Sequence, residues 1–70
     1  MTASINVTVN GKERAFDSGS RLNDLLRVLE LDPRMVVVEH NRNIVRRPQL
    51  EATLLEDGDC IELVHFVGGG

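Results

Sequence analysis

The feature of the sequence with the clearest chemical use is a run of three glycines, Gly68, Gly69 and Gly70, directly after an apolar stretch. Three extended residues reach about 10 Å, and glycine alone lets a backbone pass through a channel too narrow for a Cβ atom. We therefore expect Gly68 and Gly69 to thread into another protein and Gly70 to deliver a terminal carboxylate there. That carboxylate is ionised at neutral pH and is a poor electrophile, but joining it to AMP gives a mixed anhydride that sulfur or amine nucleophiles can attack. The alternative is a frayed chain end or a cloning remnant.

The other residues with catalytic potential are isolated. His40, His65 and the single cysteine, Cys60, show neither C-x-x-C nor H-x-x-x-H spacing, which argues against a metal site. Alternation places both histidines at strand ends near the helix-covered side, and it points Cys60 away from Ile61. No adjacent base is present to activate the Cys60 thiol, and no glycine-rich loop joins a strand to a helix to hold phosphate. We therefore expect no active site, no metal and no bound cofactor.

Length, charge and composition restrict the remaining functions. Seventy residues make one small domain, and a net charge of −3 disfavours binding to nucleic-acid phosphates. The aromatic residues, Phe16 and Phe66, are too few to stack bases. The longest apolar run, Met35–Val38, is too short to cross a membrane, no signal-peptide pattern is present, and one cysteine cannot form an internal disulfide. The sequence predicts a cytoplasmic protein that binds neither nucleic acid nor membranes.

A run of acidic residues lies in the last third of the chain. Five acids occur between residues 51 and 62 without a lysine or arginine, namely Glu51, Glu56, Asp57, Asp59 and Glu62. Such a run usually forms a solvated face. The functional alternative is an acidic patch beside the C-terminus that steers docking onto a basic partner.

The start of the chain predicts a β-hairpin. Ile5–Val9 alternates apolar and polar residues, as a half-buried strand does. Asn10-Gly11 is a dipeptide that tolerates the positive φ angles of a tight hairpin turn. Residues 14–17 then form the returning strand, with Phe16 as its apolar anchor.

An amphipathic helix follows the hairpin. Ser20 is the expected N-cap, and the helix should end near Leu31 because Pro33 disfavours helical geometry at the residue before it. The apolar residues recur at i, i+3, i+4 and i+7, which is one face of a helix, and they are Leu22, Leu25, Leu26 and Leu29.

The rest of the chain predicts three more strands. Met35–Val38 is continuous and mostly β-branched, as a central strand with apolar neighbours on both faces is. Ile44–Val45 is a short strand, and Cys60–Val67 is the last strand, after a turn at Asp57-Gly58-Asp59. Residues 49–56 have mixed patterning and are expected to form an irregular crossover.

This order of elements predicts an α+β fold with a mixed four- to five-stranded sheet and one helix packed on one face. Short connections and crossover handedness place the first and last strands side by side in the centre, which is the β-grasp, or ubiquitin-like, arrangement. Residues 1–67 would form the domain and residues 68–70 a flexible tail. The expected core consists of Ile5, Val7, Val9, Leu22, Leu25, Leu26, Leu29, Val36, Val38, Ile61 and Leu63.

Alternation along the last strand also predicts an apolar patch. Ile61 and Leu63 face the helix, so Val64 and Phe66 face the other side, where seventy residues supply no second helix to cover them. An exposed apolar patch of this kind usually marks a binding site. With neighbours from the third strand and acids at the rim, the expected partner interface consists of Val37, Glu39, Glu62, Val64, Phe66 and Val67. The alternative is that Phe66 folds over the sheet as a local lid.

The chain resembles the ThiS family of thiamine-pathway sulfur carriers over essentially its whole length. The resemblance includes the early Asn-Gly hairpin and the Leu-rich helix. Its more specific part is the combination of residues 41–45, the Asp57-Gly58-Asp59 turn, the Ile61-Glu62-Leu63-Val64 strand and the end from His65 to Gly70. One departure lies after the Ile/Val pair, where many members have proline and this chain has arginine, with Pro48 following two residues later.

The resemblance implies a protein cosubstrate without an active site of its own. An E1-like adenylating enzyme of the ThiF type would activate the Gly70 carboxylate with ATP. A persulfide-bearing sulfur donor would convert the acyl-adenylate to a thiocarboxylate. A thiazole synthase of the ThiG type would then take that sulfur into the thiazole of thiamine.

Three alternatives share part of this pattern. The small subunit of molybdopterin synthase has the same fold, tail and chemistry but is usually longer. A carrier for another sulfur pathway or for protein conjugation is a second alternative, although a single lysine, Lys12, makes chain-building on itself unfavourable. A β-grasp binding module of the TGS type, found in RNA-associated proteins, is the third, and both the glycine tail and the acidic balance argue against it.

Overall fold

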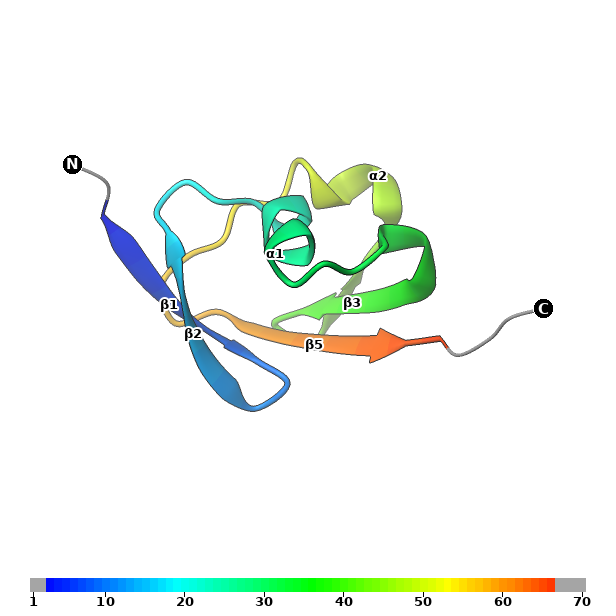
Figure 1. The fold of residues 1–70 in the computed structure, drawn as a ribbon, viewed down its shortest axis with the longest axis horizontal. Helices are drawn as coiled ribbons and strands as arrows, with labels where there is room; N and C mark the ends of the chain where they lie inside the picture. The colour runs from blue at the N-terminus through cyan, green and yellow to red at the C-terminus, as the bar shows by residue number, and fades with distance from the viewer. Residues whose placement is uncertain (1–2, 67–70) are drawn as a thin grey trace.

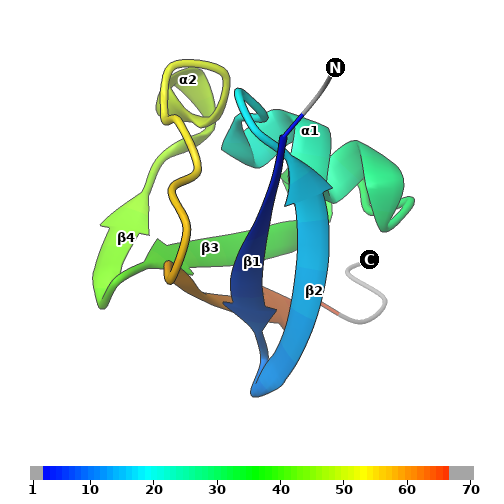
Figure 2. The ribbon, with the colours of Figure 1, turned by 90° about the vertical axis from the view of Figure 1, so that its left-hand side faces the viewer.

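The computed structural model describes residues 3–66, which form one five-stranded sheet. The helices lie on one side of this sheet (Figures 1 and 2). The strand order is β2-β1-β5-β3-β4. The strands are β1 (Ser4–Val9), β2 (Lys12–Asp17), β3 (Val36–His40), β4 (Asn43–Val45) and β5 (Cys60–His65). The first and last strands are neighbours and run parallel, whereas the other pairs are antiparallel. The predicted mixed sheet is confirmed.

The expected hairpin forms where the Asn-Gly dipeptide predicted it. Asn10 and Gly11 have φ angles of 49° and 82°, the left-handed geometry of a two-residue turn whose twist matches the flanking strands. Val9 therefore pairs with Lys12, and Ile5 with Phe16. In this register, successive residues of β2 point to opposite faces of the sheet, and Phe16 points to the buried face.

The main helix, α1 (Leu22–Val28), is shorter than the sequence predicts at both ends. Its N-cap is Arg21, not Ser20, and the Arg21 backbone N–H donates to Asp24 Oδ2 at 2.8 Å. At the other end Glu30 adopts a φ angle of 58°. The N–H of Leu31 then donates to the carbonyl of Leu26 at 2.9 Å, which is a Schellman turn. This turn, rather than the proline further on, ends the helix.

The connection between β4 and β5 is more ordered than the irregular crossover that the patterning predicts. It begins with a second short helix, α2 (Arg47–Leu50). It is then tied to the start of α1, because Leu22 N–H donates to the Thr53 carbonyl at 3.0 Å and Leu55 N–H donates to the Ser20 carbonyl at 2.9 Å. A further short 3₁₀ helix, η1 (Pro33–Met35), leads into β3.

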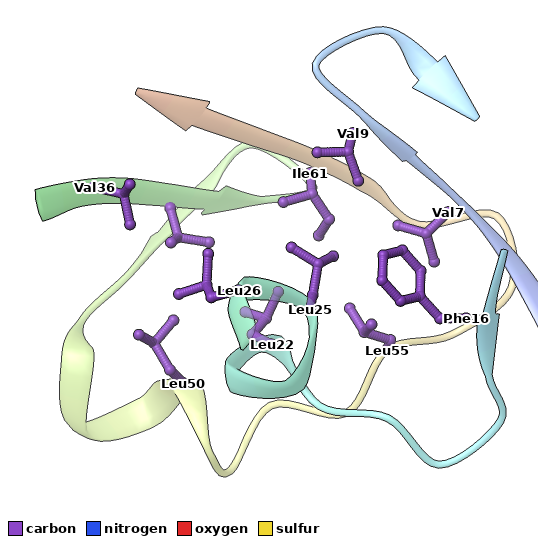
Figure 3. Packing of buried hydrophobic residues seen from close by; sticks show 11 residues of the cluster. Val7, Val9, Phe16, Leu22, Leu25, Leu26, Val36, Leu50, Leu55 and Ile61 are labelled. Atoms are coloured by element: carbon purple, nitrogen blue, oxygen red, sulfur yellow. The ribbon is translucent and has the colours of Figure 1, made fainter. Parts of the chain in front are cut away.

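The core lies between α1 and the sheet (Figure 3). Eight of the expected core residues are buried, namely Val7, Val9, Leu22, Leu25, Leu26, Val36, Val38 and Ile61. The other three, Ile5, Leu29 and Leu63, are only partly buried, because a seven-residue helix is about 10 Å long and cannot cover a whole face of the sheet. Phe16, Leu50 and Leu55 complete the core.

The expectation that the chain has no second helix is wrong, but the consequence drawn from it holds. The second helix lies on the same side of the sheet as α1 (Figure 2), and its Leu50 belongs to the same buried cluster. The other side of the sheet therefore has no helix over it within the described residues; we call it the open face. No helix among residues 3–66 combines the length and apolar character needed to cross a membrane.

Candidate functional site

The three glycines singled out by the sequence, together with Val67, lie outside the described residues. The structure does fix the point from which they continue. The backbone N–H of Phe66 donates to the Met35 carbonyl at 2.8 Å, so the chain is held beside β3 one residue past the end of β5. Phe66, the last described residue, is therefore held at the β3 side of the sheet.

The open face brings the expected apolar residues together. Val64 on β5 pairs directly with Val37 on β3, and Val64 and Phe66 are 56% and 47% exposed. Because successive residues of a strand point to opposite faces, Val64 and Val37 lie on the side away from Ile61, which is fully buried under the helix. The structure thus places Val37, Val64 and Phe66 near one another at the root of the tail.

Sequence reasoning missed Ile44, which extends this surface. Ile44 on β4 pairs with Glu39 on β3, so it lies on the open face, and 67% of it is exposed. Its neighbours in sequence gave no signal, because a three-residue strand has too little alternation to assign a face. Only the register with β3 shows where Ile44 points.

The charged strand residues that point to the open face are acidic, whereas Arg46 and Arg47, just past β4, border Val37 and Ile44. Glu39 and Glu62 pair directly across β3 and β5, and like charges in this position destabilise a sheet. The register of β2 and β1 adds Glu13 and Asp17 to the same face, whereas Lys12 and Arg14 point to the helix side. An acidic surface with an apolar centre favours a partner that presents basic and apolar groups.

Two members of the acidic run between residues 51 and 62 have structural roles. Asp57 Oδ1 accepts from the backbone N–H of Asn6 at 2.8 Å. Asp59 is buried and its carboxylate accepts from His40 Nε2 at 2.7 Å and from the Glu56 backbone N–H at 2.9 Å. Only Asp59 of the five is buried, so the acidic patch that the sequence offers as an alternative can include the other four acids only.

The environment of Asp59 favours its ionised form. Burial opposes ionisation of this carboxyl and would raise its pKa, but hydrogen bonds from His40, from the Glu56 N–H and from the Asn41 side chain outweigh that effect. The pKa of Asp59 consequently lies below its ordinary value. The charge on Asp59 thus helps to hold the turn before β5 against the turn after β3.

The two histidines and the cysteine occupy three different environments. His40 is partly buried on the helix side, against Asp59. His65 is exposed at the end of β5, and Cys60 is an exposed free thiol on the open face. Within residues 3–66 no three His, Cys, Asp or Glu side chains are arranged to hold a metal ion. What the described residues offer beside the root of the tail is an exposed apolar surface.

Comparison with known proteins agrees with this geometry. The model of the ThiS family matches residues 7–70. Sulfur carrier protein ThiS of Bacillus subtilis is 41% identical over 64 residues, which cover 89% of this chain and 96% of that protein. The crystal structure of thiamine biosynthesis protein ThiS from Geobacter metallireducens has a TM-score of 0.79 and 36% identity, and the match covers 94% of this chain and all of that one.

A second kind of relative is much longer than this chain. Thiazole synthase of Magnetococcus marinus is 39% identical over 64 residues, which cover 91% of this chain but only 20% of that protein. A thiazole synthase of Paramagnetospirillum magneticum is matched to the same extent. This chain thus spans about a fifth of the length of these two relatives. With a family match over residues 7–70 and the β-grasp fold in common with solved ThiS structures, the chain belongs to the ThiS family.

Proposed function

We propose that this protein is a sulfur carrier for the thiazole of thiamine, and that the Gly70 carboxylate carries the sulfur. The observation that carries the proposal is the match to a sulfur carrier protein over nearly the full length of both chains. The glycines at residues 68–70 support it, because a tail without side chains can enter a narrow active site. The protein then acts as a cosubstrate of other enzymes.

The chemistry of the tail requires three steps. The Gly70 carboxylate attacks the α-phosphate of ATP on an adenylating enzyme of the ThiF type, and pyrophosphate leaves. The terminal sulfur of an enzyme persulfide then attacks the acyl carbon of the adenylate, and AMP leaves. A thiol cleaves the resulting acyl disulfide, which leaves a thiocarboxylate on Gly70.

The proposed sulfur acceptor is a thiazole synthase of the ThiG type. Two proteins named thiazole synthase contain a stretch similar to this chain, and joining a carrier to its acceptor in one chain raises the local concentration of each for the other. We place this work in the reducing cytoplasm, where an exposed free thiol such as Cys60 is stable.

The open face near the tail is the proposed docking surface for one of these enzymes. Val37, Val64 and Phe66 would form its apolar centre, with Val67 continuing it along the chain. Glu39 and Glu62 would provide charge that speeds association with a basic partner. Their direct opposition across two strands costs stability in the free protein, and a partner's cation placed between them would relieve that repulsion.

The test is intact mass spectrometry of the 70-residue chain after incubation with ATP, the adenylating enzyme and the sulfur donor from the same organism. We expect a mass gain equal to the difference between a sulfur and an oxygen atom. A matched control lacks Gly69 and Gly70; it should keep the melting temperature of the parent protein and gain no mass. A parent chain that forms no adenylate and no thiocarboxylate would contradict the proposal.

A further inference from the structure

A groove lies on the helix side of the sheet and is lined by residues of β1, β2 and β5. In this region β5 runs on past the β1–β2 hairpin, as the ribbon shows (Figure 1). Its volume is about 420 Å³, which is within the range of sites that hold small ligands or a few side chains. The groove opens at the end of α1, where the short helix leaves the sheet uncovered. Its floor is apolar and consists of Val9, Leu29, Leu31, Val36 and Leu63.

The rim of this groove is basic, although the protein as a whole is acidic. Lys12, Arg14 and His65 line it, and no acidic side chain does. Alternation along β2 produces this separation, because Glu13 lies between the two cations and points to the open face. Among the strand residues, the helix side therefore carries the cations Lys12 and Arg14, and the open face carries acids.

The two cations of β2 have no ionic partners within the described residues. Ion pairs among residues 3–66 join Arg27 to Asp24, Arg34 to Asp32 and His40 to Asp59. Lys12 and Arg14 take part in none of them. A carboxylate brought to this rim would gain two cations without breaking an existing pair.

The edge of β5 beside the groove also has free backbone groups. Phe66 donates its N–H toward β3, to the Met35 carbonyl, so the backbone groups of His65 point the other way, toward β1. The residue before it on that edge, Leu63, is paired with the Asn10 side chain. Within residues 3–66 nothing pairs with the N–H or the carbonyl of His65 on that edge. An extended segment can therefore add to β5 at this point.

We infer that this groove docks an extended acidic segment of a partner protein. The segment pairs with the His65 backbone, places an apolar side chain on the groove floor and sets a carboxylate against Lys12 and Arg14. The inference rests on the proposed function, in which one tail is handed first to an activating enzyme and then to a synthase. The basic groove serves one of these two partners, and the acidic open face serves the other.

The test compares variants on the two faces in binding to the purified adenylating enzyme and thiazole synthase. The groove variant is Lys12→Glu with Arg14→Glu, and Lys12→Ala with Arg14→Ala replaces it if the melting curve shows loss of fold. The matched control is Glu39→Lys with Glu62→Lys. We expect the groove variant to weaken binding to one partner by about tenfold or more, with a smaller dependence on salt, and to leave the other partner's affinity unchanged. The control should show the opposite selectivity.

The backbone contact has its own pair of variants. His65→Pro removes the N–H that the docked segment would use, and proline is tolerated where that N–H is not in the ladder. His65→Ala keeps the N–H and is the control. We expect the proline variant, and not the alanine variant, to lose binding to the partner that the groove variant loses.

Several outcomes would overturn the inference. One is a groove variant that binds both partners normally, or that loses both equally. Another is a wild-type dimer in sedimentation that the groove variant dissociates, because the occupant would then be a second copy. A third is a shift of the Lys12 and Arg14 amide resonances when residues 68–70 are removed, because the occupant would then be the tail. Thiocarboxylate formation by the wild-type chain separates these outcomes from failure of the proposed function.

Discussion

The side chain of Asn10 hydrogen-bonds to both backbone groups of Leu63. The Leu63 N–H donates to Asn10 Oδ1 at 2.7 Å, and Asn10 Nδ2 donates to the Leu63 carbonyl at 3.2 Å. The backbone pairing of β1 with β5 covers only two residue pairs, so this amide extends the central ladder by one step. At the other end of the ladder, the Asp57 carboxylate accepts from the Asn6 N–H in the same way.

The first prediction concerns this side-chain extension of the ladder. Asn10→Gly keeps the left-handed turn geometry, which glycine adopts freely, but removes both hydrogen bonds to Leu63. We expect the free energy of unfolding to fall by about 1–3 kcal/mol, measured by urea denaturation. Asn10→Asp keeps the acceptor and loses the donor, so it should fall between the glycine variant and the parent. Equal stability of the glycine variant and the parent would show that the amide contributes nothing.

The second prediction concerns acid stability. The pKa of Asp59 is below its unfolded value of 3.8 in the folded protein, so its ionised form stabilises the fold. That contribution is fully present above the unfolded pKa and is lost as the pH falls through the folded pKa. We expect Asp59→Asn to lower stability by about 1–3 kcal/mol at neutral pH and to flatten the decrease in stability below pH 3.8.

Asp32 provides the control for this measurement. Its pKa is about 2, because side-chain and backbone hydrogen bonds from Arg34 stabilise its carboxylate. Like that of Asp59, its pKa is thus lowered in the folded protein, so its contribution to stability is also lost as the pH falls. Its pair with Arg34 is solvent-exposed and is screened by salt. The effect of Asp32→Asn should therefore disappear at high ionic strength, whereas that of Asp59→Asn should persist. Loss of both effects in salt would argue against a special role for the buried carboxylate.

The third prediction concerns the core under α1. Leu26 is 1% exposed and lies in the centre of the cluster (Figure 3), so Leu26→Ala should cost about 2–5 kcal/mol. Leu29→Ala is the matched control, because that residue is only partly buried at the edge of the cluster, and its cost should be clearly smaller. Denaturant midpoints of the two variants give the comparison. A silent Leu26→Ala variant would mean that the helix packs on the sheet in another orientation.

The parts of the fold that depend on local patterns could be predicted from the sequence. The alternation in Ile5–Val9, the Asn10-Gly11 turn and the Leu22-Leu25-Leu26 spacing each specify one element by short-range sterics and burial. The order of these elements then leaves few arrangements of strands. The central placement of β1 beside β5 was reached in this way.

The parts that depend on tertiary contacts could not be predicted. Helix α2 follows Arg46, starts at Arg47 and contains Pro48, so its sequence has no helical spacing of apolar residues that would predict it. Its contribution to the fold, the burial of Leu50 in the core, is visible only in the structure. Helix α1 ends because Glu30 takes a left-handed conformation, which is uncommon for glutamate. The face of Ile44 depends on the register of β4 with β3, and that register is not visible in three residues.

The last prediction concerns the open face as a docking surface. Phe66 is half exposed beside the root of the tail, and an aromatic residue in the centre of an interface often contributes more than about 1 kcal/mol to binding. We expect Phe66→Ala to keep the melting temperature within a few degrees and to weaken docking to the adenylating enzyme or the synthase by about fivefold or more. Calorimetric titration beside a melting curve measures both quantities.

The control for Phe66 is another exposed apolar residue at a distance from this face. Val28 is 65% exposed and belongs to α1 on the opposite side of the sheet, so Val28→Ala should leave binding to the same enzyme unchanged. Charge reversal at Glu39 or Glu62 should mainly slow association with that enzyme, because rim charges act on the encounter rather than on the lifetime of the complex. Normal affinity of the Phe66→Ala variant for both enzymes, or a variant that unfolds, would remove Phe66 from the docking surface. The apolar centre of that surface would then consist of Val37 and Val64.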